Sequence, residues 1–312
     1  MRPRIIAITG ATASGKSALA MQLAQQLGGE IVCMDSMQIY RGMDIGTAKP
    51  TPAERQTVPH HMLDVVPPDA PYTVADYAEA ASAVIRGILS RGKLPLLVGG
   101  TGLYLKALMH GLSLGVSRSD PAIRARLEAI ADQPGGKQQL HRMLSQVDEA
   151  SAKKLHPNDL RRVIRAIEVY ELTGTPLSQT RQEEAGEFTV LPLAIRMERE
   201  QLFARIEMRV DQMLEMGLFS EVKSLLEAGV SPEAQAMQGI GYKEMVPAVQ
   251  GILPVEEARR QIILNTRHYA KRQETWFKGE PATCWLAAEN ALPLAREAIA
   301  AFLADTQHQA KE

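Results

Sequence analysis

The sequence predicts an α/β protein in which a parallel sheet is flanked by helices and interrupted by an all-helical insertion. Three observations lead to this expectation. A glycine-rich loop lies between a short apolar run and a helical stretch close to the N-terminus. Further short apolar runs alternate with helical stretches, which is the pattern of a parallel sheet. Strand signals then disappear over a long middle stretch and return after it.

The elements follow from the spacing of apolar residues along the chain. Strands are predicted at residues 4–9, 31–34, 94–98 and 190–196. Helices are predicted at residues 17–27, 73–91, 199–216, 221–228 and 256–278. The middle stretch contains helical patterns at 121–131, 137–146 and 158–172, joined by Gly/Pro turns. We therefore expect a core formed by residues 1–112 and 188–312, with a helical insertion at 113–187.

Composition limits the possible classes of protein. The 312 residues are 45% hydrophobic and 23% charged, as in an ordinary globular protein. A net charge of −1 and an aromatic content of 4% argue against a protein that coats nucleic acid, so any such contact must come from local patches. Cys33 and Cys284 are too few for a disulfide framework or a cysteine metal site. No apolar stretch reaches membrane-spanning length, and we expect a cytoplasmic protein without membrane contact.

A phosphate-binding loop is the most specific local signal. The segment fits the P-loop pattern G-x-x-x-x-G-K-[ST] at every fixed position and lies between a predicted strand and a predicted helix. Its backbone N–H groups and the helix N-terminus favour phosphate oxygens, Lys16 adds a full charge, and Ser17 can hold Mg²⁺. The binding residues predicted here are Gly10, Ala11, Thr12, Ala13, Ser14, Gly15, Lys16 and Ser17. The core is thus expected to be P-loop NTPase-like.

The loop alone does not identify its ligand, because ATP, GTP and non-nucleotide diphosphates present similar oxygens. A GTPase should carry an N-K-x-D guanine motif, which the sequence lacks. The apolar run that ends in Asp35 comes early for the acidic strand of an ATPase. ATP-binding and nucleotide-binding activity therefore remain possible at this point.

Polar residues follow two of the other predicted strands. Asp35 should lie close to the loop, where a carboxylate can orient Mg²⁺ or accept a proton; a simple turn or N-cap aspartate is the alternative. Thr101, in a glycine turn after residues 94–98, is a plausible hydrogen-bond donor to the phosphates. His60 and His61 are adjacent, point apart on regular structure, and are expected to be structural rather than a metal pair.

Seven blocks in the same order make the sequence resemble the bacterial tRNA dimethylallyltransferases, the IPP transferase family. They are the P-loop, DSMQIYRGMDIGTAKP at 35–50, HHMLD at 60–64, GGTGLY at 99–104, HPND at 156–159, GIGYKE at 239–244 and KRQxxW at 271–276. The resemblance covers nearly the whole chain. One departure is Ala11, which stands where many members have proline; alanine tolerates the same backbone.

The resemblance implies transfer of a dimethylallyl group from its diphosphate to N6 of adenosine 37, beside the tRNA anticodon. The P-loop would then hold the leaving diphosphate rather than ATP. Lys16, the loop amides, Mg²⁺ and Thr101 would stabilise the departing anion. Asp35 would accept a proton from the adenine amine or hydrogen-bond to it. Thr12 and Ser14 would also touch the diphosphate, and Arg205 and Arg209, at i and i+4 of a helix, could add charge there or be solvated surface residues.

The same resemblance implies contacts with the anticodon stem-loop, with the target adenine flipped out of its stack. The implied tRNA-binding residues are Asp35, Ser36, Met37, Gln38, Thr101, Arg124, Arg161, Arg162, Val163, Ile164, Arg165, Gly239, Ile240, Gly241, Tyr242, Lys243 and Glu244. On the helix predicted at 256–278, one face is basic and either solvated or in contact with tRNA phosphates. That face comprises Arg260, Arg267, Lys271 and Lys278, while the other side, with Ile262, Ile263, Tyr269, Ala270, Trp276 and Phe277, is expected to be core.

Two other classes of protein compete with this prediction. A P-loop kinase would transfer phosphate from ATP to a small acceptor and would be indifferent to RNA. A nucleotide-dependent switch protein is disfavoured by the missing guanine motif. A prenyltransferase should instead release diphosphate only when tRNA is present, and we expect it to be a monomer because tRNA would cover much of its surface.

Overall fold

The computed structural model describes residues 2–111, 120–180 and 186–304. Two compact units divide the chain: Met1–Met109 together with Glu187–Glu312 form a core unit, and His110–Gly186 form a helical unit. These boundaries lie within three residues of those predicted from the sequence. Each unit has its own hydrophobic core, so each is described separately below.

The core unit is built on a six-stranded parallel sheet with the order β3-β2-β4-β1-β5-β6. The strands are β1 (Arg4–Gly10), β2 (Glu30–Cys33), β3 (His60–His61), β4 (Pro95–Val98), β5 (Thr189–Arg196) and β6 (Cys284–Ala287). The predicted parallel sheet is therefore confirmed. The four strands predicted from the sequence are the four central ones, and the two unpredicted strands lie at the edges.

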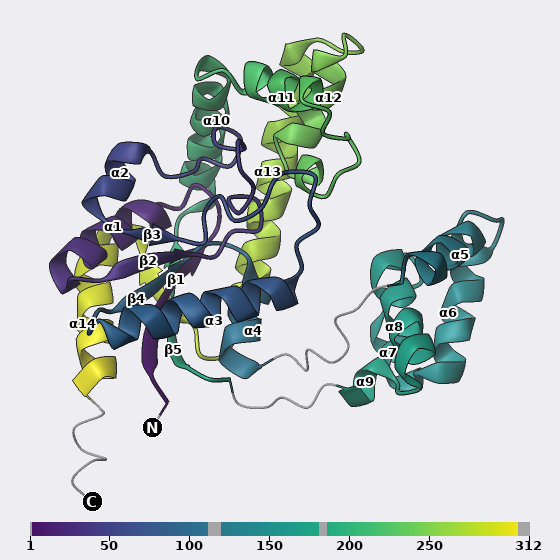
Figure 1. Cartoon of the computed structure of the whole chain (residues 1–312), viewed down its shortest axis with the longest axis horizontal. Helices are drawn as coiled ribbons and strands as arrows, with labels where there is room; N and C mark the ends of the chain where they lie inside the picture. The colour runs from purple at the N-terminus through teal and green to yellow at the C-terminus, as the bar shows by residue number, and fades with distance from the viewer. Residues whose placement is uncertain (1, 112–119, 181–185, 305–312) are drawn as a thin grey trace, which may run out of the picture. The chain divides into compact units, whose positions relative to one another are not determined.

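Helices cover both faces of this sheet, because alternate residues of each strand point to opposite sides (Figure 1). Ile6 and Ile8 of β1 pack in one cluster with helices α1 (Lys16–Leu27) and α14 (Ala291–Ala304). Ile5 and Ala7 pack in a second cluster with the helices on the other side. Those helices are α3 (Val74–Ser90), α4 (Gly102–His110) and α13 (Val255–Lys278). The cluster continues away from the sheet to α10 (Arg199–Glu215), α11 (Leu218–Glu227) and α12 (Tyr242–Val249) (Figure 1).

Local sequence signals explain where several of these helices begin and end. Thr73 and Asp76 form a reciprocal capping box that starts α3, and Thr51 and Glu54 do the same for the short helix α2 (Pro52–Thr57). Gly28 has φ +61° and ends α1 in the left-handed conformation that glycine adopts at low cost. These signals place the strand ends and loops that form the site.

The helical unit consists of five helices within its described residues. They are α5 (Pro121–Ala131), α6 (Gly136–Val147), α7 (Glu149–Lys154), α8 (Leu160–Thr173) and α9 (Leu177–Thr180). Apolar residues including Leu127, Leu140 and Val163 form its own core. No strand occurs between residues 120 and 180, in agreement with the sequence pattern.

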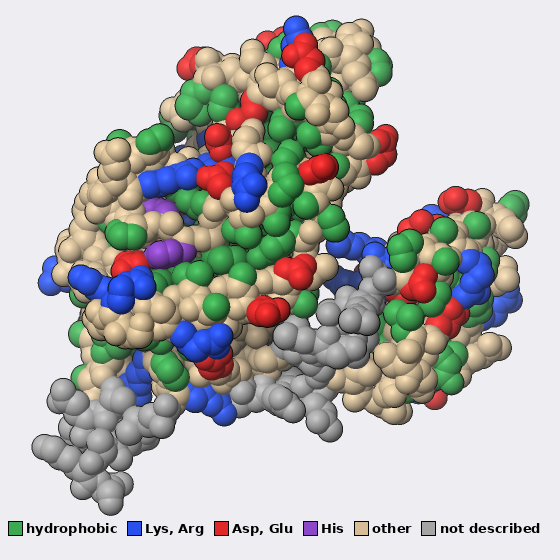
Figure 2. Space-filling view, viewed as in Figure 1, with side chains coloured by type: hydrophobic (Ala, Val, Ile, Leu, Met, Phe, Trp, Pro, Cys, Tyr) green, Lys and Arg blue, Asp and Glu red, His purple; other side chains and the backbone are tan. Residues whose placement is uncertain are grey.

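Charge on the surface is mixed, as the near-neutral total predicts. Figure 2 shows acidic and basic side chains interspersed across the drawn face of the core unit. Within the described part of the chain, no helix is both long and apolar enough to cross a membrane.

Candidate active site at the P-loop

The carboxyl ends of the central strands bring the predicted site residues to one edge of the sheet. The P-loop follows β1, Asp35 follows β2, and the turn containing Thr101 follows β4. Because β1 pairs with β4 and β4 pairs with β2 in parallel, these three segments are neighbours in space. Ligands of open parallel sheets bind at this edge, as the sequence pattern predicts.

The P-loop is held in a conformation that requires small residues. Gly10 has φ +127°, Gly15 has φ +96°, and Ala13 has φ +64°, all in the left-handed region. A Cβ on Gly10 would lie 3.1 Å from the carbonyl oxygen of Ile195 in β5. The hydroxyl of Ser14 is buried and has no partner within the described residues, so the loop contains a polar atom available to a bound anion.

Gln273 of α13 ties the loop to the turn after β4. Its Oε1 accepts a hydrogen bond from the backbone N–H of Thr12 at 2.8 Å, and its Nε2 donates to the carbonyl of Gly100 at 3.0 Å. The Gln273 side chain is 5% exposed. A Cβ on Gly100 would lie 1.9 Å from Nε2 of Gln273, so this contact requires glycine.

The pKa of Lys16 depends on its burial and on the charged side chains around it. Burial and, after it, the positive charge of Arg209 lower the pKa of Lys16 to about 8, although the charge of Asp35 acts in the opposite direction. The ammonium group donates to the carbonyl of Ala11 at 3.3 Å. A lysine whose charged form is destabilised by burial is stabilised more by a bound anion than a solvent-exposed lysine is.

Arg205 and Arg209 of α10 lie at the P-loop rather than in bulk solvent. Nε of Arg205 donates to the carbonyl of Ala13 at 2.9 Å. Burial lowers the pKa of Arg209, and so does the charge of Arg205, while Asp35 raises it. Arginine stays charged in proteins, so α10 adds two cations to the one on Lys16.

Asp35 and Thr101 lie together beside the loop. Oδ1 of Asp35 accepts the N–H of Met37 at 2.9 Å, and Oγ1 of Thr101 accepts the N–H of Ser36 at 3.1 Å. Tyr269 of α13 hydrogen-bonds to the Thr101 side chain, and burial together with the charge of Asp35 raises the pKa of its phenol. The phenol therefore stays protonated, and Tyr269 lies beside Thr101 rather than in the core predicted from helical spacing.

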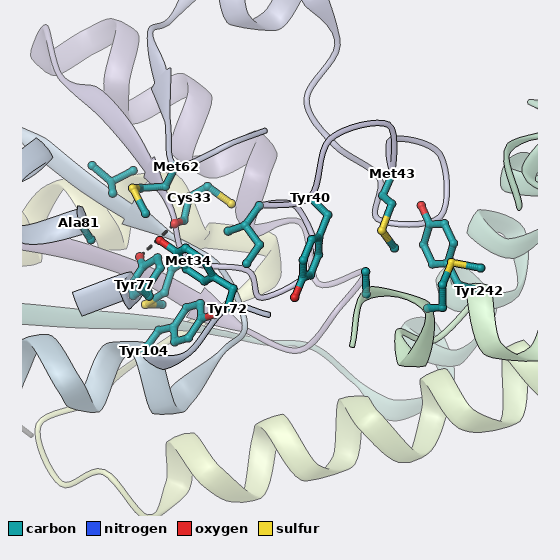
Figure 3. Close-up of a cluster of buried hydrophobic side chains, with 14 of the residues drawn as sticks. Cys33, Met34, Tyr40, Met43, Met62, Tyr72, Tyr77, Ala81, Tyr104 and Tyr242 are labelled. Carbon is teal, nitrogen blue, oxygen red and sulfur yellow. Dashed lines mark hydrogen bonds between the residues drawn. The ribbon is translucent and has the colours of Figure 1, made fainter. Parts of the chain in front are cut away.

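A buried aromatic cluster fixes the end of β2 beneath Asp35. The hydroxyl of Tyr77 donates to the carbonyl of Cys33 at 2.9 Å, and its ring stacks on Tyr104 with centroids 3.8 Å apart (Figure 3). Tyr77 comes from α3 and Tyr104 from α4, so two helices fix the position of one strand end. Asp35 is thus presented from a rigid base.

Two pockets meet at the P-loop. One, of about 70 Å³, is lined by Lys16, Ser17, Arg209 and Asp35, and also by Thr12, Cys33, Gln38, Thr47, Pro50, His60 and Gly99 among others. The other, of about 290 Å³, is lined by Lys16, Ser17 and Arg209 again, and also by Ala13, Gly15, Ala48, Arg205 and several methionines. The first pocket is lined by cations and a carboxylate, whereas the second is lined by cations and apolar side chains.

Two of the residues implied to bind tRNA next to Asp35 are occupied by contacts within the chain. Gln38 donates from Nε2 to the carbonyls of Thr47 and Ala48, and its Oε1 accepts the thiol hydrogen of Cys33. Met37 lies against Gly239, where an added Cβ would be 2.8 Å from its sulfur. The 35–38 and 239–244 segments, far apart in sequence, therefore pack on one another.

Within residues 239–244 the side chains divide into buried and exposed ones. Tyr242 is fully buried, and Glu244 is 4% exposed and accepts hydrogen bonds from the N–H of Gly241 and from Asn265. Lys243 is exposed, and Ile240 is half-buried. Lys243 and the backbone are the groups of this segment best placed for contact with RNA.

In the helical unit, two predicted tRNA contacts share one buried carboxylate. Glu168 is fully buried and accepts two hydrogen bonds from Arg124, at 2.9 and 3.1 Å, and one from Arg165 at 2.6 Å. These bonds lower the pKa of Glu168 although burial alone would raise it. Arg124 and Arg165 therefore have a structural role whatever else they bind.

The other residues predicted on α8 lie on two faces. Val163 and Ile164 are 0% and 7% exposed and belong to the core of the helical unit. Arg161 is exposed, and Arg162 is exposed and lies 3.3 Å from Asp159. Arg161 and Arg162 are thus the side chains of this stretch that face solvent.

The predicted basic face of α13 is partly neutralised. Arg260 pairs with Glu257, Arg267 lies 3.3 Å from Glu207, and Lys278 lies 2.8 Å from Glu274. Lys271 is exposed. The face is therefore less cationic than its sequence spacing suggests.

The adjacent histidines have separate surroundings, as predicted. Nε2 of His61 lies 2.7 Å from Glu30, which also pairs with Arg91. His60 lines the pocket that contains Asp35, and burial lowers its pKa. In the residues that the structure describes, no cluster of three potential metal-binding His, Cys, Asp or Glu side chains occurs.

Sequence reasoning missed three residues that shape the site: Gln273, Tyr269 and Glu221. Gln273 stands in the KRQ run that carried part of the family resemblance, which was its only signal. The carboxylate of Glu221 accepts hydrogen bonds from the backbone of residues 44–46. Nothing in the spacing of Glu221 or Tyr269 indicates these contacts.

The fold and the site together define a P-loop protein in which cations and a carboxylate line one pocket beside the loop. Comparisons with known proteins narrow this class. A family model described as IPP transferase matches residues 38–280, and one described as isopentenyl transferase matches residues 3–67. The chain belongs to the IPP transferase family, whose relatives below are named as tRNA dimethylallyltransferases.

Similar proteins match over nearly their full lengths. A tRNA dimethylallyltransferase 1 from Pelobacter propionicus is 51% identical over 304 residues, covering 96% of this chain and 98% of that protein. A tRNA dimethylallyltransferase from Pelotomaculum thermopropionicum is 49% identical over 289 residues, covering 92% and 91%. These matches confirm the family predicted from the seven sequence blocks.

Solved structures agree with the sequence matches. The tRNA isopentenylpyrophosphate transferase of Bacillus halodurans has a TM-score of 0.74 and 40% identity, with all of both chains covered. A eukaryotic dimethylallyltransferase described as acting on tRNA has a TM-score of 0.78 and 33% identity, covering 92% of this chain and 74% of the other. The P-loop fold predicted from the sequence is therefore confirmed.

Proposed function

We propose that this chain transfers the dimethylallyl group of dimethylallyl diphosphate to N6 of adenosine 37 in tRNA. The observation that carries the proposal is the pocket that Lys16, Ser17 and Arg209 line together with Asp35. The cations can stabilise a departing diphosphate, and the carboxylate of Asp35 can receive a proton from an amine. Neither the cations nor Asp35 requires a binding site for a phosphoryl acceptor, which a kinase would need.

The transfer breaks one bond and forms another, and it moves one proton. The bond between C1 of the allyl group and the diphosphate oxygen breaks, and its electron pair leaves with the diphosphate. A bond forms between N6 and C1, and the proton lost from N6 moves towards Asp35. Lys16, Arg205 and Arg209, with the loop amides, stabilise the charge that develops on the leaving group. Because an exocyclic amine is a weak nucleophile, positioning of N6 by Asp35 and Thr101 matters more than basicity.

Mg²⁺ fits the oxygen donors present at this site. The ion prefers oxygen ligands, keeps several waters, and binds through one or two protein groups together with phosphates. Ser17 offers a hydroxyl that lines both pockets, and Asp35 offers a carboxylate in one of them. When bound, Mg²⁺ would neutralise diphosphate charge; we assign Ser17 as its direct protein ligand.

The RNA partner is the anticodon stem-loop. A base in a single-stranded loop costs less to unstack than one in a duplex, so adenosine 37 can enter a pocket at the strand ends. Arg161, Arg162, Lys243 and the 35–38 segment are the exposed or half-exposed groups that we propose contact it. We further propose that the protein acts as a monomer in the cytoplasm.

Transfer of label tests the proposal directly. The protein is mixed with radiolabelled dimethylallyl diphosphate and an unmodified tRNA transcript, and label in the RNA is counted. A transcript with guanosine at position 37 is the matched control, and [γ-³²P]ATP in place of the donor tests for a kinase. We expect label only with adenosine 37 and diphosphate release that depends on RNA. RNA without label, or ADP formed from ATP in step with turnover, overturns the proposal.

A further inference from the structure

Glu221 of α11 holds a loop that lies far from it in the sequence. Oε2 of Glu221 accepts the backbone N–H groups of Asp44 and Ile45 at 2.9 and 2.8 Å. Oε1 accepts the N–H of Gly46 at 3.1 Å and the hydroxyl of Tyr242 at 2.6 Å. One half-buried carboxylate thus satisfies three consecutive backbone donors and one phenol.

Tyr242 supports the same loop from α12. Its ring lies under Gly46, where an added Cβ would be 2.5 Å from the ring, and the residue is fully buried. The ring lies beside the loop that carries Met43 (Figure 3). Burial and the charge of Glu221 raise the pKa of the Tyr242 hydroxyl, so it remains a donor to the carboxylate.

The loop in question, residues 44–50, spans the two pockets at the P-loop. Thr47 and Pro50 line the pocket that contains Asp35, and Ala48 lines the pocket that contains Arg205. Ala48 has φ +48°, a left-handed conformation that alanine adopts only when its surroundings hold it there. The backbone of segment 44–50 therefore contributes to the shape of both pockets.

Other contacts of segment 44–50 come from the N-terminal part of the chain. Nζ of Lys49, whose side chain is 1% exposed, lies 2.6 Å from Asp44 and 2.7 Å from Asp64, and donates to the carbonyl of Tyr40. Gln38 donates to the carbonyls of Thr47 and Ala48, as described above. Those contacts hold residues 47–49 of the segment, whereas Glu221 attaches residues 44–46 to α11.

We propose that Glu221 is a positioning residue for prenyl transfer, because it holds segment 44–50 in the shape that closes both pockets around Lys16. The proposal rests on the proposed function. Three charge-assisted hydrogen bonds accepted by one carboxylate restrict the segment more than three neutral ones would. A displacement of about 1 Å at the segment would misplace the donor relative to Asp35 and could cost about 10²-fold in rate.

Variants of Glu221 separate this role from a general effect on folding. Glu221→Ala removes all four hydrogen bonds, whereas Glu221→Gln keeps one acceptor oxygen. Glu227→Gln is the matched control, since Glu227 lies on the same helix, is exposed, and has a lysine 3.7 Å away. Amide hydrogen exchange of the peptide that contains residues 44–46 reports the local bonds. Steady-state kinetics with dimethylallyl diphosphate and tRNA, normalised by active-site titration, report positioning.

We expect faster exchange at 44–46 and a kcat/KM for dimethylallyl diphosphate lowered by about 10- to 100-fold in Glu221→Ala, with a smaller loss in Glu221→Gln. The loss should combine a higher KM for the donor with a lower kcat, while the KM for tRNA stays at the control value. A protein that was merely less folded would lose kcat before normalisation and keep its donor KM.

Two outcomes overturn the inference. In one, exchange at 44–46 rises but kcat/KM equals that of Glu227→Gln; in the other, exchange does not change. If Glu221→Ala does not fold, Tyr242→Phe keeps the ring under Gly46, removes one of the four bonds, and must show a smaller loss of the same kind. Failure of the wild-type protein to label tRNA would overturn the proposed function, whereas full activity of the variants would overturn only the role of Glu221.

Discussion

The side chain of Gln273 accepts a hydrogen bond from the backbone N–H of Thr12, 261 residues earlier in the chain, at 2.8 Å. One amide of the P-loop is therefore already used by the protein. The same side chain donates to Gly100, so the P-loop and the turn that carries Thr101 are held at a fixed separation. One side chain thus links the two segments that we propose bind the diphosphate and the adenine.

Loss of the two Gln273 hydrogen bonds should change the positions of both bound substrates. We expect Gln273→Leu to lower kcat/KM by about 10- to 100-fold, because a loosened loop misplaces the diphosphate relative to Asp35. It also leaves the Thr12 N–H and the Gly100 carbonyl without their partner, which costs about 1–3 kcal/mol each when they stay buried. Glu274→Gln, one residue further on and facing Lys278, is the control. Steady-state kinetics and thermal unfolding of both variants give the comparison.

Removal of the proton acceptor should act on turnover rather than on RNA binding. Asp35→Ala is expected to cut kcat by about two to four orders of magnitude, the range for loss of a general base. Its tRNA affinity, measured by filter binding, should stay close to that of wild type because the other groups that we propose contact the RNA are unchanged. Asp69→Ala changes an exposed aspartate outside both pockets and serves as the control. Wild-type turnover in Asp35→Ala would remove this residue from the mechanism.

The lowered pKa of Lys16 predicts a pH-dependent uptake of protons. In the free protein the ammonium loses its proton as pH rises through about 8, against a usual value of 10.5. A bound diphosphate favours the charged form, so binding should take up a proton at pH 8 to 9 and much less at pH 6.5. Calorimetric titration with inorganic diphosphate in buffers of different ionisation enthalpy measures this uptake.

Lys16→Met supplies the control for that measurement, because any uptake by the diphosphate itself remains in the variant. Uptake that is equal in wild type and variant would contradict the assignment. The sign for stability is opposite to that of a usual ion pair. Since the folded state binds Lys16's proton less tightly than the unfolded state, the contribution of this group to folding stability rises between pH 8 and 10.5.

Charge reversal on the helical unit should weaken RNA binding without touching the donor site. Arg161→Glu is the better variant, because Arg165 is bonded to the buried Glu168 and its loss would disturb the fold. We expect the slope of log affinity against log salt to become shallower by about 1 for one lost phosphate contact. The affinity for inorganic diphosphate should not change. Arg142→Glu, exposed on α6, is the control; the same salt slope in both variants would leave Arg161 as a solvated residue.

Much of the core was predictable because strands and helices have different periods. The central strands are apolar runs buried on both faces, and such runs stand out from the amphipathic helices between them. β3 has only two residues, too few for a periodic signal. β6 is as long as β2 and β4, but it is partly exposed, whereas those two strands are buried throughout. The edge strands could be found only through the partners with which they pair.

The site was predictable where a motif states the chemistry and not where it depends on packing. The P-loop, Asp35 and Thr101 follow strand ends, and the topology brings strand ends together. Helical spacing assigned Tyr269 to the apolar side of α13, but the structure places its hydroxyl at Thr101. Spacing gives the direction of a side chain about its own helix, not the group that it meets. Glu221 illustrates the same limit, since its partners are backbone amides without a sequence signature.

Two supports of the P-loop region, Glu221 and Gln273, lie in the C-terminal third of the chain. A ribosome completes the glycine loop, Lys16 and Asp35 before it has made a fifth of the protein. The N–H of Thr12 then lacks its hydrogen-bond partner until Gln273 is made. The N–H groups of residues 44–46 likewise lack their carboxylate partner until Glu221 is made. A growing chain therefore contains the P-loop motif early, but the contacts that hold the loop in its final shape form only after the C-terminal third has been synthesised.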